Sequence, residues 1–245
     1  MTFRAFVLFA LLCLLTGAAG CRKNVEQPSP EEIRADDQRL VEMAAETVDH
    51  FREKDGNRVL SKLLDGCAGV FVVPETLRMG FILGMDAGRG VLLSRDENGV
   101  WSGPAFYDLG GGNFGYQVGV RDGRLLIIYR DRELMLRAVE DGPTLDADFT
   151  VTLLNVDMKT ASQALVEGKA AVALYDGRGA YAGVAFSGGG IFSDLSATAR
   201  YYGTYAATPR AVVAEHRFTS PDARPLWDAL NGTRTDAAAT GTDAP

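Results

Sequence analysis

The chain has 245 residues, of which 47% are hydrophobic and 23% are charged, and its formal net charge is −7 at pH 7. This composition is ordinary for a chain that buries a core, so it excludes an intrinsically disordered protein and allows one large domain or two small ones. The acidic balance argues against nucleic acid as a partner, because phosphate recognition needs a basic surface. Attraction to anionic lipid would have to come from a local basic patch.

Residues 1–20 have the layout of a secretory signal peptide. Arg4 supplies a positive charge, residues 5–15 form an unbroken apolar run, and residues 16–20 are small. The apolar run is shorter than the ~20 residues that a membrane-spanning helix needs. We therefore predict that residues 1–20 are removed on export.

Cys21 follows these small residues directly, and the segment resembles the lipobox of bacterial lipoproteins. The resemblance implies that Cys21 receives a diacylglyceryl group, with palmitate as a typical further acyl group, and becomes the mature N-terminus. Acyl chains contribute ~0.8 kcal/mol per buried CH₂, so two or three would hold the chain on a membrane. The alternative is that an ordinary signal peptidase cuts nearby and leaves Cys21 as a free thiol.

The residue after the cysteine bears on localisation. Arg22 stands where an aspartate would favour retention in the inner membrane of many Gram-negative bacteria, an expectation that comes from the lipoprotein class. We therefore expect the protein on the periplasmic face of a bacterial membrane, the outer membrane in particular.

A helix is predicted after a short polar tether at residues 21–29. Ser29, Pro30 and Glu32 form a capping box with proline at the first helical position. Apolar residues then recur at three- and four-residue steps as far as Phe51, which is typical of a helix with one buried face. A second short helix is predicted at residues 59–64.

From residue 68 onward the pattern changes to short strands separated by turn residues. Strands are predicted at 70–73, 81–83, 91–93, 105–109, 114–120, 125–129, 149–154, 170–175 and 181–186, and further helices at 131–139 and 194–202. The fold class is α+β, with N-terminal helices packed on a curved antiparallel β-sheet or a partly closed barrel. We expect one domain at residues 30–218 and a C-terminal tail at 219–245 that is disordered at its end.

Motifs of enzymes and metal sites are missing from the sequence. His50 and His216 are the only histidines, there is no G-x-S-x-G elbow, and Cys67 has no partner for a disulfide or a zinc site. Residues 110–115 match G-x-G-x-x-G, but a dinucleotide site needs a following helix, whereas residues 116–120 alternate like a strand. We therefore expect neither an enzyme, nor a cofactor, nor a metal ion.

Four basic residues cluster across the junction of the two N-terminal helices: Arg52, Lys54, Arg58 and Lys62. Guanidinium groups bind phosphates in a bidentate manner, and a basic amphipathic helix can lie in a membrane interface. These residues are therefore candidates for contact with lipid headgroups. The alternative is that they are solvated surface charges balanced by nearby acids.

Several glycine- and aromatic-rich blocks occur in a fixed order at residues 69–74, 80–84, 88–92, 101–107, 109–119 and 201–203. With these blocks, the chain resembles the SYLF domain family, a lipid-binding domain of bacterial lipoproteins and of eukaryotic proteins that also engage actin or phosphoinositides. The resemblance covers residues 59–213 and implies that the glycine motif belongs to a β-rich core. It also implies a non-enzymatic domain that binds phospholipid or phosphoinositide.

Actin is not expected as a partner, because an exported bacterial lipoprotein does not meet it. The alternative function is a protein-interaction or structural module of the cell envelope, in which the first helix docks its apolar face, with Ile33, Leu40 and Val48, on a partner protein.

Overall fold

A computed structural model of the chain describes residues 29–55, 58–79, 83–114, 121–142, 153–155, 167–177 and 189–233. The predicted signal peptide, Cys21 and the tether up to residue 28 lie outside these ranges. The chain divides into a unit at Met1–Ile33 and a compact unit at Arg34–Pro245.

Helix α2 (Pro30–Asp55) begins with the capping box that the sequence predicts. The backbone N–H of Glu32 donates to Ser29 Oγ at 3.2 Å, and the N–H of Ser29 donates to Glu32 Oε2 at 2.6 Å. Two N–H groups at the start of the helix are thereby satisfied, and the hydrogen bonds lower the pKa of Glu32. Helix α3 (Val59–Leu64) has the predicted bounds.

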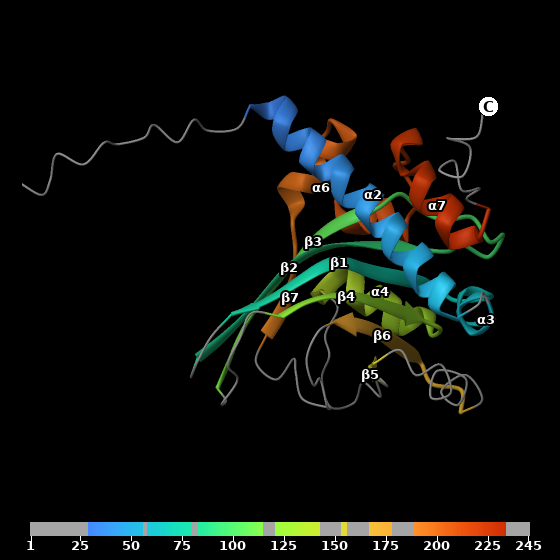
Figure 1. The fold of residues 1–245 in the computed structure, drawn as a ribbon. Helices are drawn as coiled ribbons and strands as arrows, with labels where there is room; N and C mark the ends of the chain where they lie inside the picture. Colours follow the sequence, from blue (N-terminus) through green and yellow to red (C-terminus); the bar gives the residue numbers. More distant parts are fainter. Residues whose placement is uncertain are drawn as a thin grey trace, which may run out of the picture. The chain divides into compact units, whose positions relative to one another are not determined.

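One mixed sheet of seven strands forms the centre of the unit at Arg34–Pro245, in the order β5-β6-β4-β1-β2-β3-β7 (Figure 1). The strands are β1 (Gly69–Met79), β2 (Leu83–Ser94), β3 (Ala105–Phe114), β4 (Arg121–Tyr129), β5 (Leu153–Asn155), β6 (Ala171–Gly177) and β7 (Gly189–Ser193). All pairs are antiparallel except β5 with β6. Within the described strands the sheet is open, with β5 and β7 at its edges, so the α+β fold is confirmed in its curved-sheet form and not as a barrel.

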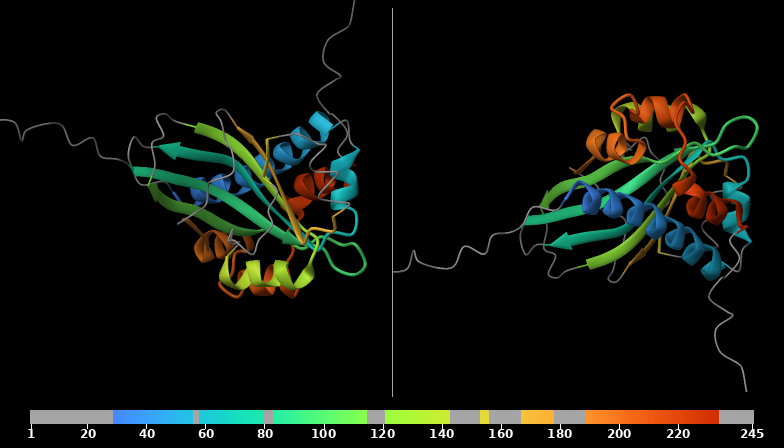
Figure 2. Two further views of the ribbon diagram at one scale, coloured as in Figure 1. Left: turned by 90° about the horizontal axis from the view of Figure 1, so that it is seen from below. Right: turned by 90° about the horizontal axis from the view of Figure 1, so that it is seen from above.

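Both faces of the sheet are covered. Along β1, Val70 and Val72 belong to the core on one side, whereas Phe71 and Val73 belong to the core on the other, because successive side chains of a strand point to opposite faces. Helices α2, α3 and α7 (Arg224–Asn231) contribute to the first core. Helix α4 (Arg132–Asp141) and the π-helix η1 (Arg210–Ala214) contribute to the second (Figure 2).

Strand β1 continues past Pro74, where the sequence predicted that it would end. Its register with β2 shifts between Val72 and Glu75, and its register with β4 shifts between Val73 and Thr76. Proline has no N–H to donate to a neighbouring strand, and a bulge accommodates it within a central strand. The bulge bends β1 at the point where a groove opens beneath α2.

Helix α7 lies beyond residue 218, where the sequence predicted that the domain would end. Leu226, Ala229 and Leu230 are buried in the same core as α2. The helix has proline in its first turn and ends at Gly232, whose φ of 70° is left-handed. These are ordinary start and stop signals, but eight residues carry too short a periodic pattern to reveal the helix.

Other elements differ in extent from the sequence prediction. Strand β7 and helix η1 were not predicted, whereas α4 and α6 (Leu195–Tyr202) lie where helices were expected. The strand predicted at 181–186 lies outside the described residues.

Among the described helices, none combines the length and apolar character needed to cross a bilayer.

Candidate functional site

A groove of about 630 Å³ opens between α2 and the bulged part of the sheet. Leu40, Met43, Pro74 and Leu109 provide its apolar lining, and Gly88 completes it. The glycine is required here, because a Cβ at Gly88 would lie 2.9 Å from the carbonyl oxygen of Glu75. An apolar lining of this kind suits the hydrocarbon part of an amphipathic molecule.

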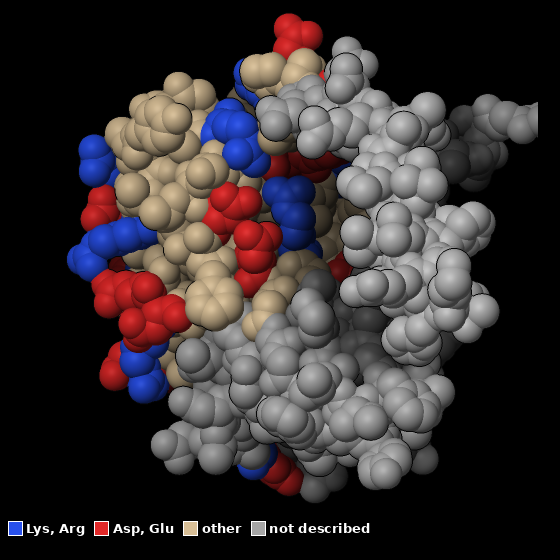
Figure 3. Space-filling model, turned by 90° about the vertical axis from the view of Figure 1, so that its left-hand side faces the viewer, with Lys and Arg blue, Asp and Glu red and all other residues tan. Residues whose placement is uncertain are grey.

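Charged residues of both signs line the same groove: Asp36, Arg39, Glu75, Arg89 and Asp108. Acidic and basic side chains also lie next to one another, not in separate fields, on the face of the molecule shown in Figure 3. The groove is therefore not a purely basic phosphate site.

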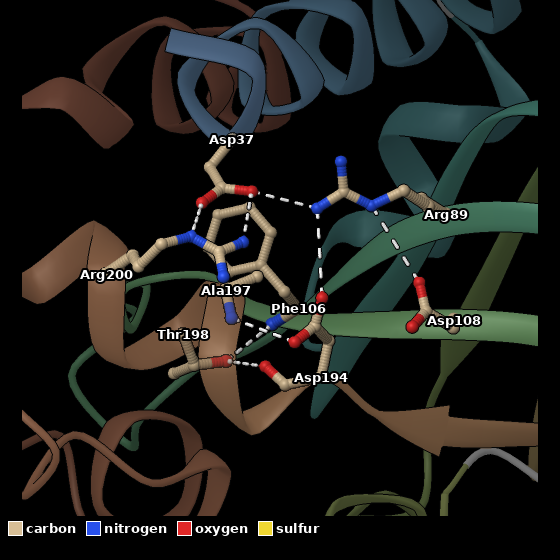
Figure 4. A network of polar contacts seen from close by, with 8 residues as sticks. All are labelled: Asp37, Arg89, Phe106, Asp108, Asp194, Ala197, Thr198 and Arg200. Atoms are coloured by element: carbon tan, nitrogen blue, oxygen red, sulfur yellow. Dashed lines mark hydrogen bonds and ion pairs between the residues drawn. The ribbon is translucent and has the colours of Figure 1, made fainter. Parts of the chain in front are cut away.

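Arg89 is held in place by a buried carboxylate. Its Nη2 donates to Asp37 Oδ1 at 2.8 Å, and Arg200 of α6 donates to the other oxygen from Nε at 3.1 Å (Figure 4). The Asp37 side chain is 0% exposed, whereas that of Arg89 is 39% exposed. Two guanidinium groups thus compensate one buried charge, which would otherwise be costly to bury.

The other contacts of Arg89 are looser. Its Nε lies 3.8 Å from Asp108 Oδ1, and its Nη2 lies 3.9 Å from Asp194 Oδ2, so both are ion pairs beyond hydrogen-bonding distance. Burial and the charge of Asp194 raise the pKa of Asp108, and Arg89 opposes this shift. The N–H groups of Arg89 that point toward Asp108 and Asp194 therefore make no hydrogen bonds to these carboxylates, and they face the groove.

Asp194 belongs to a hydrogen-bonded corner that fixes α6 against β3. Its carboxylate accepts from the N–H of Ala197 at 2.8 Å, which caps the helix. Thr198 Oγ1 donates to the carbonyl oxygen of Asp194 and accepts from the N–H of Phe106 (Figure 4). The corner places Arg200 beneath α2, where it meets Asp37.

The structure places Arg52, one of the four predicted headgroup contacts, inside the fold. Its side chain donates to the carbonyl oxygens of Ala229 and Leu230 at 2.8 and 2.6 Å, and to Ser61 Oγ at 3.0 Å. Arg52 is only 8% exposed. The Arg52 side chain therefore satisfies the last carbonyls of α7 and does not face solvent, where a lipid headgroup could reach it.

The other three predicted basic residues lie near the surface. Lys54 Nζ contacts Asp176 Oδ2 at 2.5 Å, and His50 Nε2 contacts the same oxygen at 2.5 Å, which joins the end of α2 to β6. Arg58 and Lys62 are exposed at the start of α3 and within it. The predicted headgroup contacts of these three residues stay predictions.

The glycine motif lies in strand β3, where Gly110 to Phe114 pair with β2. This agrees with the expectation that these residues belong to a β-rich core. Gly110 also pairs with Gly190 of β7. Gly115 lies outside the described residues.

The block Trp-Ser-Gly-Pro at 101–104 joins the C-terminal helix to the sheet. Trp101 Nε1 donates to Asn231 Oδ1 at 3.0 Å, and Trp227 Nε1 donates to the carbonyl oxygen of Ser102 at 2.9 Å. The hydroxyl of Tyr202 donates to the carbonyl oxygen of Pro104. This block, one of those that carry the resemblance to the SYLF domain family, thus has a structural role.

A serine and a histidine meet on the other side of the sheet without the geometry of a catalytic pair. Ser94 Oγ donates its single hydrogen to the carbonyl oxygen of Val213, and His216 Nε2 lies 2.7 Å from the same Oγ. The histidine nitrogen must therefore carry the hydrogen of this second bond. In that tautomer it cannot accept the serine proton, so it does not activate Ser94 as a nucleophile.

Cys67 is a buried free thiol, and burial raises its pKa to about 12. A thiol in this state is not reactive. Within the described ranges, no three His, Cys, Asp or Glu side chains are grouped in a way that could hold a metal ion.

Sequence reasoning missed the groove, because Asp37 and Arg200 are 163 residues apart. Asp37 lies within the helix pattern as one polar residue among many. The sequence does mark Arg89, because both of its neighbours in the chain are glycines. A Cβ at one of them, Gly90, would lie 2.6 Å from the carbonyl oxygen of Val72. Such flanking glycines allow β2 to approach β1 closely.

Comparison with known proteins identifies the family. Residues 110–233, half of the chain, match the Ysc84 family, which is described as a Las17-binding protein actin regulator. The chain therefore belongs to the Ysc84 family, whose domain is the SYLF domain expected from the sequence.

Named relatives are eukaryotic. The chain is 22% identical over 210 residues to SH3 domain-containing YSC84-like protein 1 of Xenopus laevis, covering 84% of this chain and 62% of that protein. It is 25% identical over 207 residues to Protein YSC84 of Saccharomyces cerevisiae, covering 83% of this chain and 44% of that protein. The chain thus spans about half the length of these relatives, and no solved structure matches it.

Proposed function

We propose that this protein is a non-enzymatic lipid-binding protein of the bacterial cell envelope, held on the periplasmic face of the outer membrane by an acylated Cys21. The observation that carries lipid binding is the groove beneath α2, which joins an apolar lining to Arg39 and Arg89. A phospholipid is complementary to this groove, because it joins an apolar chain to a phosphate group. The signal-peptide and lipobox patterns of residues 1–21 support the anchor.

The exposed basic residues at the end of α2 and on α3 support a second contact with the membrane. Lys54, Arg58 and Lys62 lie close together in sequence, outside the groove lining. In this proposal they attract anionic headgroups, whereas the groove takes a single lipid molecule.

Vesicle co-sedimentation tests the proposal. The chain beginning at residue 21, with Cys21→Ser to remove the anchor, is mixed with neutral and anionic vesicles at low and moderate salt. We expect binding to both, with a stronger and salt-sensitive component on anionic vesicles. Absence of binding to every vesicle would overturn the proposal.

A matched pair of variants separates the basic patch from general charge. Replacing Arg58 and Lys62 with glutamine removes two exposed charges next to α2, and we expect the salt-sensitive component to fall. The control replaces Arg132 and Arg137 with glutamine, which removes two exposed charges from α4 on the other side of the sheet. Equal losses in both variants would argue against a specific role for the patch.

A protein-interaction module is the second candidate function. It is favoured by the names of relatives such as LAS seventeen-binding protein 3 of Saccharomyces cerevisiae, to which this chain is 24% identical over 212 residues. Phe192 and Leu195 provide exposed apolar surface at the junction of β7 and α6. This candidate predicts no lipid preference once the anchor is removed.

A further inference from the structure

We infer that the groove selects a zwitterionic aminophospholipid, of the ethanolamine type, over anionic and choline lipids. This inference rests on the lipid-binding function proposed above and specifies the headgroup. Its basis is the mixed charge of the groove, because three acids, Asp36, Glu75 and Asp108, line it together with two arginines.

The anionic part of such a headgroup has a partner in Arg89. The contact with buried Asp37 fixes the guanidinium group, and the ion pairs to Asp108 and Asp194 are 3.8 and 3.9 Å long. A phosphate can therefore accept hydrogen bonds from Arg89 without breaking the bond to Asp37. Guanidinium groups match phosphate oxygens well in both geometry and charge.

The cationic part has partners in the acids. Asp108 lies beside Arg89, and its side chain is 54% exposed. An ammonium group attached through a short linker to a phosphate on Arg89 would reach this carboxylate. Burial and the negative charge of Asp194 both disfavour the ionised form of Asp108, and such a cation would offset both effects.

The same chemistry disfavours the competing lipids. An anionic headgroup without an amine satisfies the arginines but leaves the acids of the groove facing a negative charge. A choline headgroup carries a positive charge but has no N–H, so it cannot donate hydrogen bonds to the carboxylates. A primary ammonium group provides both charge and donors.

The apolar lining distinguishes a lipid from a free headgroup. Leu40, Met43, Pro74 and Leu109 provide no partner for a phosphate or an amine, but they can bury part of an acyl chain. The ligand in this inference is therefore an intact phospholipid, and a soluble headgroup without acyl chains should bind much more weakly.

Native mass spectrometry in non-ionic detergent tests the inference. The chain used has Arg58 and Lys62 replaced by glutamine, so that the exposed basic patch proposed above to attract anionic headgroups does not mask the preference of the groove. The probes are phosphatidylethanolamine, phosphatidylcholine and phosphatidylglycerol with the same acyl chains, together with soluble glycerophosphoethanolamine. We expect the ethanolamine lipid to bind roughly three- to tenfold more tightly than the other two lipids, as partly exposed charge-assisted hydrogen bonds allow. Glycerophosphoethanolamine should not compete at equal concentration.

Two single variants provide the internal test: Glu75→Gln and Asp108→Asn each remove one acid of the groove. We expect both to reduce the preference for ethanolamine over choline lipid, while the control Glu97→Gln, in the turn between β2 and β3, keeps it. A preference that survives in both groove variants would overturn the inference.

The outcomes of the lipid panel are distinct. Equal binding of all three lipids, or strongest binding of the glycerol lipid, would overturn the headgroup inference and leave lipid binding in place. If the soluble headgroup binds as tightly as the intact phospholipid, the inference that the ligand is an intact lipid is overturned. Absence of binding to any probe would overturn both the inference and the function on which it rests.

Discussion

Arg89 Nη2 lies 2.8 Å from Asp37 Oδ1 and joins strand β2 to helix α2 at the wall of the groove. Among the described residues, Asp37 is the only acid that is buried, and Arg200 provides its second cation. The pair therefore has two consequences: it holds α2 on the sheet, and it orients the guanidinium group that faces the groove.

Replacing Asp37 with asparagine should destabilise the fold, because two guanidinium groups would lose their buried counter-charge. Both arginines are partly exposed, so we expect a loss of about 2–4 kcal/mol in the free energy of unfolding, at or below the usual cost of breaking a buried pair. Urea denaturation followed by circular dichroism measures it. The control is Asp36→Asn on the preceding exposed residue, and a loss of equal size there would contradict the account.

Arg52 gives a prediction that separates a structural role from a lipid contact. The variant Arg52→Met removes the donors to Ala229 and Leu230. The carbonyl of Ala229 then keeps only the N–H of Gly232, and the carbonyl of Leu230 loses its guanidinium partner. We expect a loss of about 2–3 kcal/mol in stability. Arg58→Met should leave stability within error, since Arg58 is exposed. Unchanged stability of the Arg52 variant would restore Arg52 as a candidate for headgroup contact.

Two glycines at helix ends provide a matched test of close packing. Gly142 ends α4 with φ of 81°, and a Cβ there would lie 1.8 Å from the carbonyl oxygen of Ile191. Gly203 ends α6 with φ of 70°, but a Cβ there meets nothing within 4 Å. We expect Gly203→Ala to cost about 1 kcal/mol from backbone strain alone. Gly142→Ala should cost about 3 kcal/mol or more, because backbone must move. Equal melting temperatures for the two variants would contradict the packing of α4 against β7.

The contact between His216 and Ser94 predicts a dependence of stability on pH. Burial lowers the pKa of His216 from its ordinary value of 6.5, with Arg132 acting in the same direction and Asp96 opposing it. The unfolded chain therefore binds a proton more readily than the folded chain does. The stabilisation is fully present above pH 6.5 and is lost as the pH falls from there through the folded pKa.

The variant His216→Asn isolates this contribution. Asparagine tolerates the left-handed φ of 52° at this position but does not titrate. Urea denaturation at pH 7.5 and pH 5 should show a smaller loss of stability on acidification in the variant than in the unaltered chain. Identical losses would mean that His216 does not contribute to the pH dependence.

The start of the helical layer and much of the sheet could be predicted because their signals are local. Ser29 and Glu32 are three residues apart, so the capping box is visible in the sequence, and so is the unbroken apolar run at residues 125–129. Proline at 74 was interpreted as a strand end because a proline in a central strand requires a bulge, and a bulge depends on both neighbouring strands.

The site could not be predicted, because it depends on tertiary contacts. Arg52 has the sequence environment of a surface residue, and only the docking of α7 buries it. Asp37 has the environment of a solvated helix residue until Arg89 and Arg200 reach it from a strand and a second helix. A buried charge is recognisable only after its partners are known.

The most direct test of the central claim is to map where a lipid binds. The full-length chain is incubated with a phospholipid that carries a photoreactive acyl chain, irradiated, and digested for mass spectrometry. The account predicts cross-links on the groove residues Leu40 and Met43 of α2, which unlabelled phospholipid suppresses by competition. Cross-links confined to other surfaces, such as Phe192 and Leu195, or labelling that competition does not reduce, would contradict the groove as the lipid site.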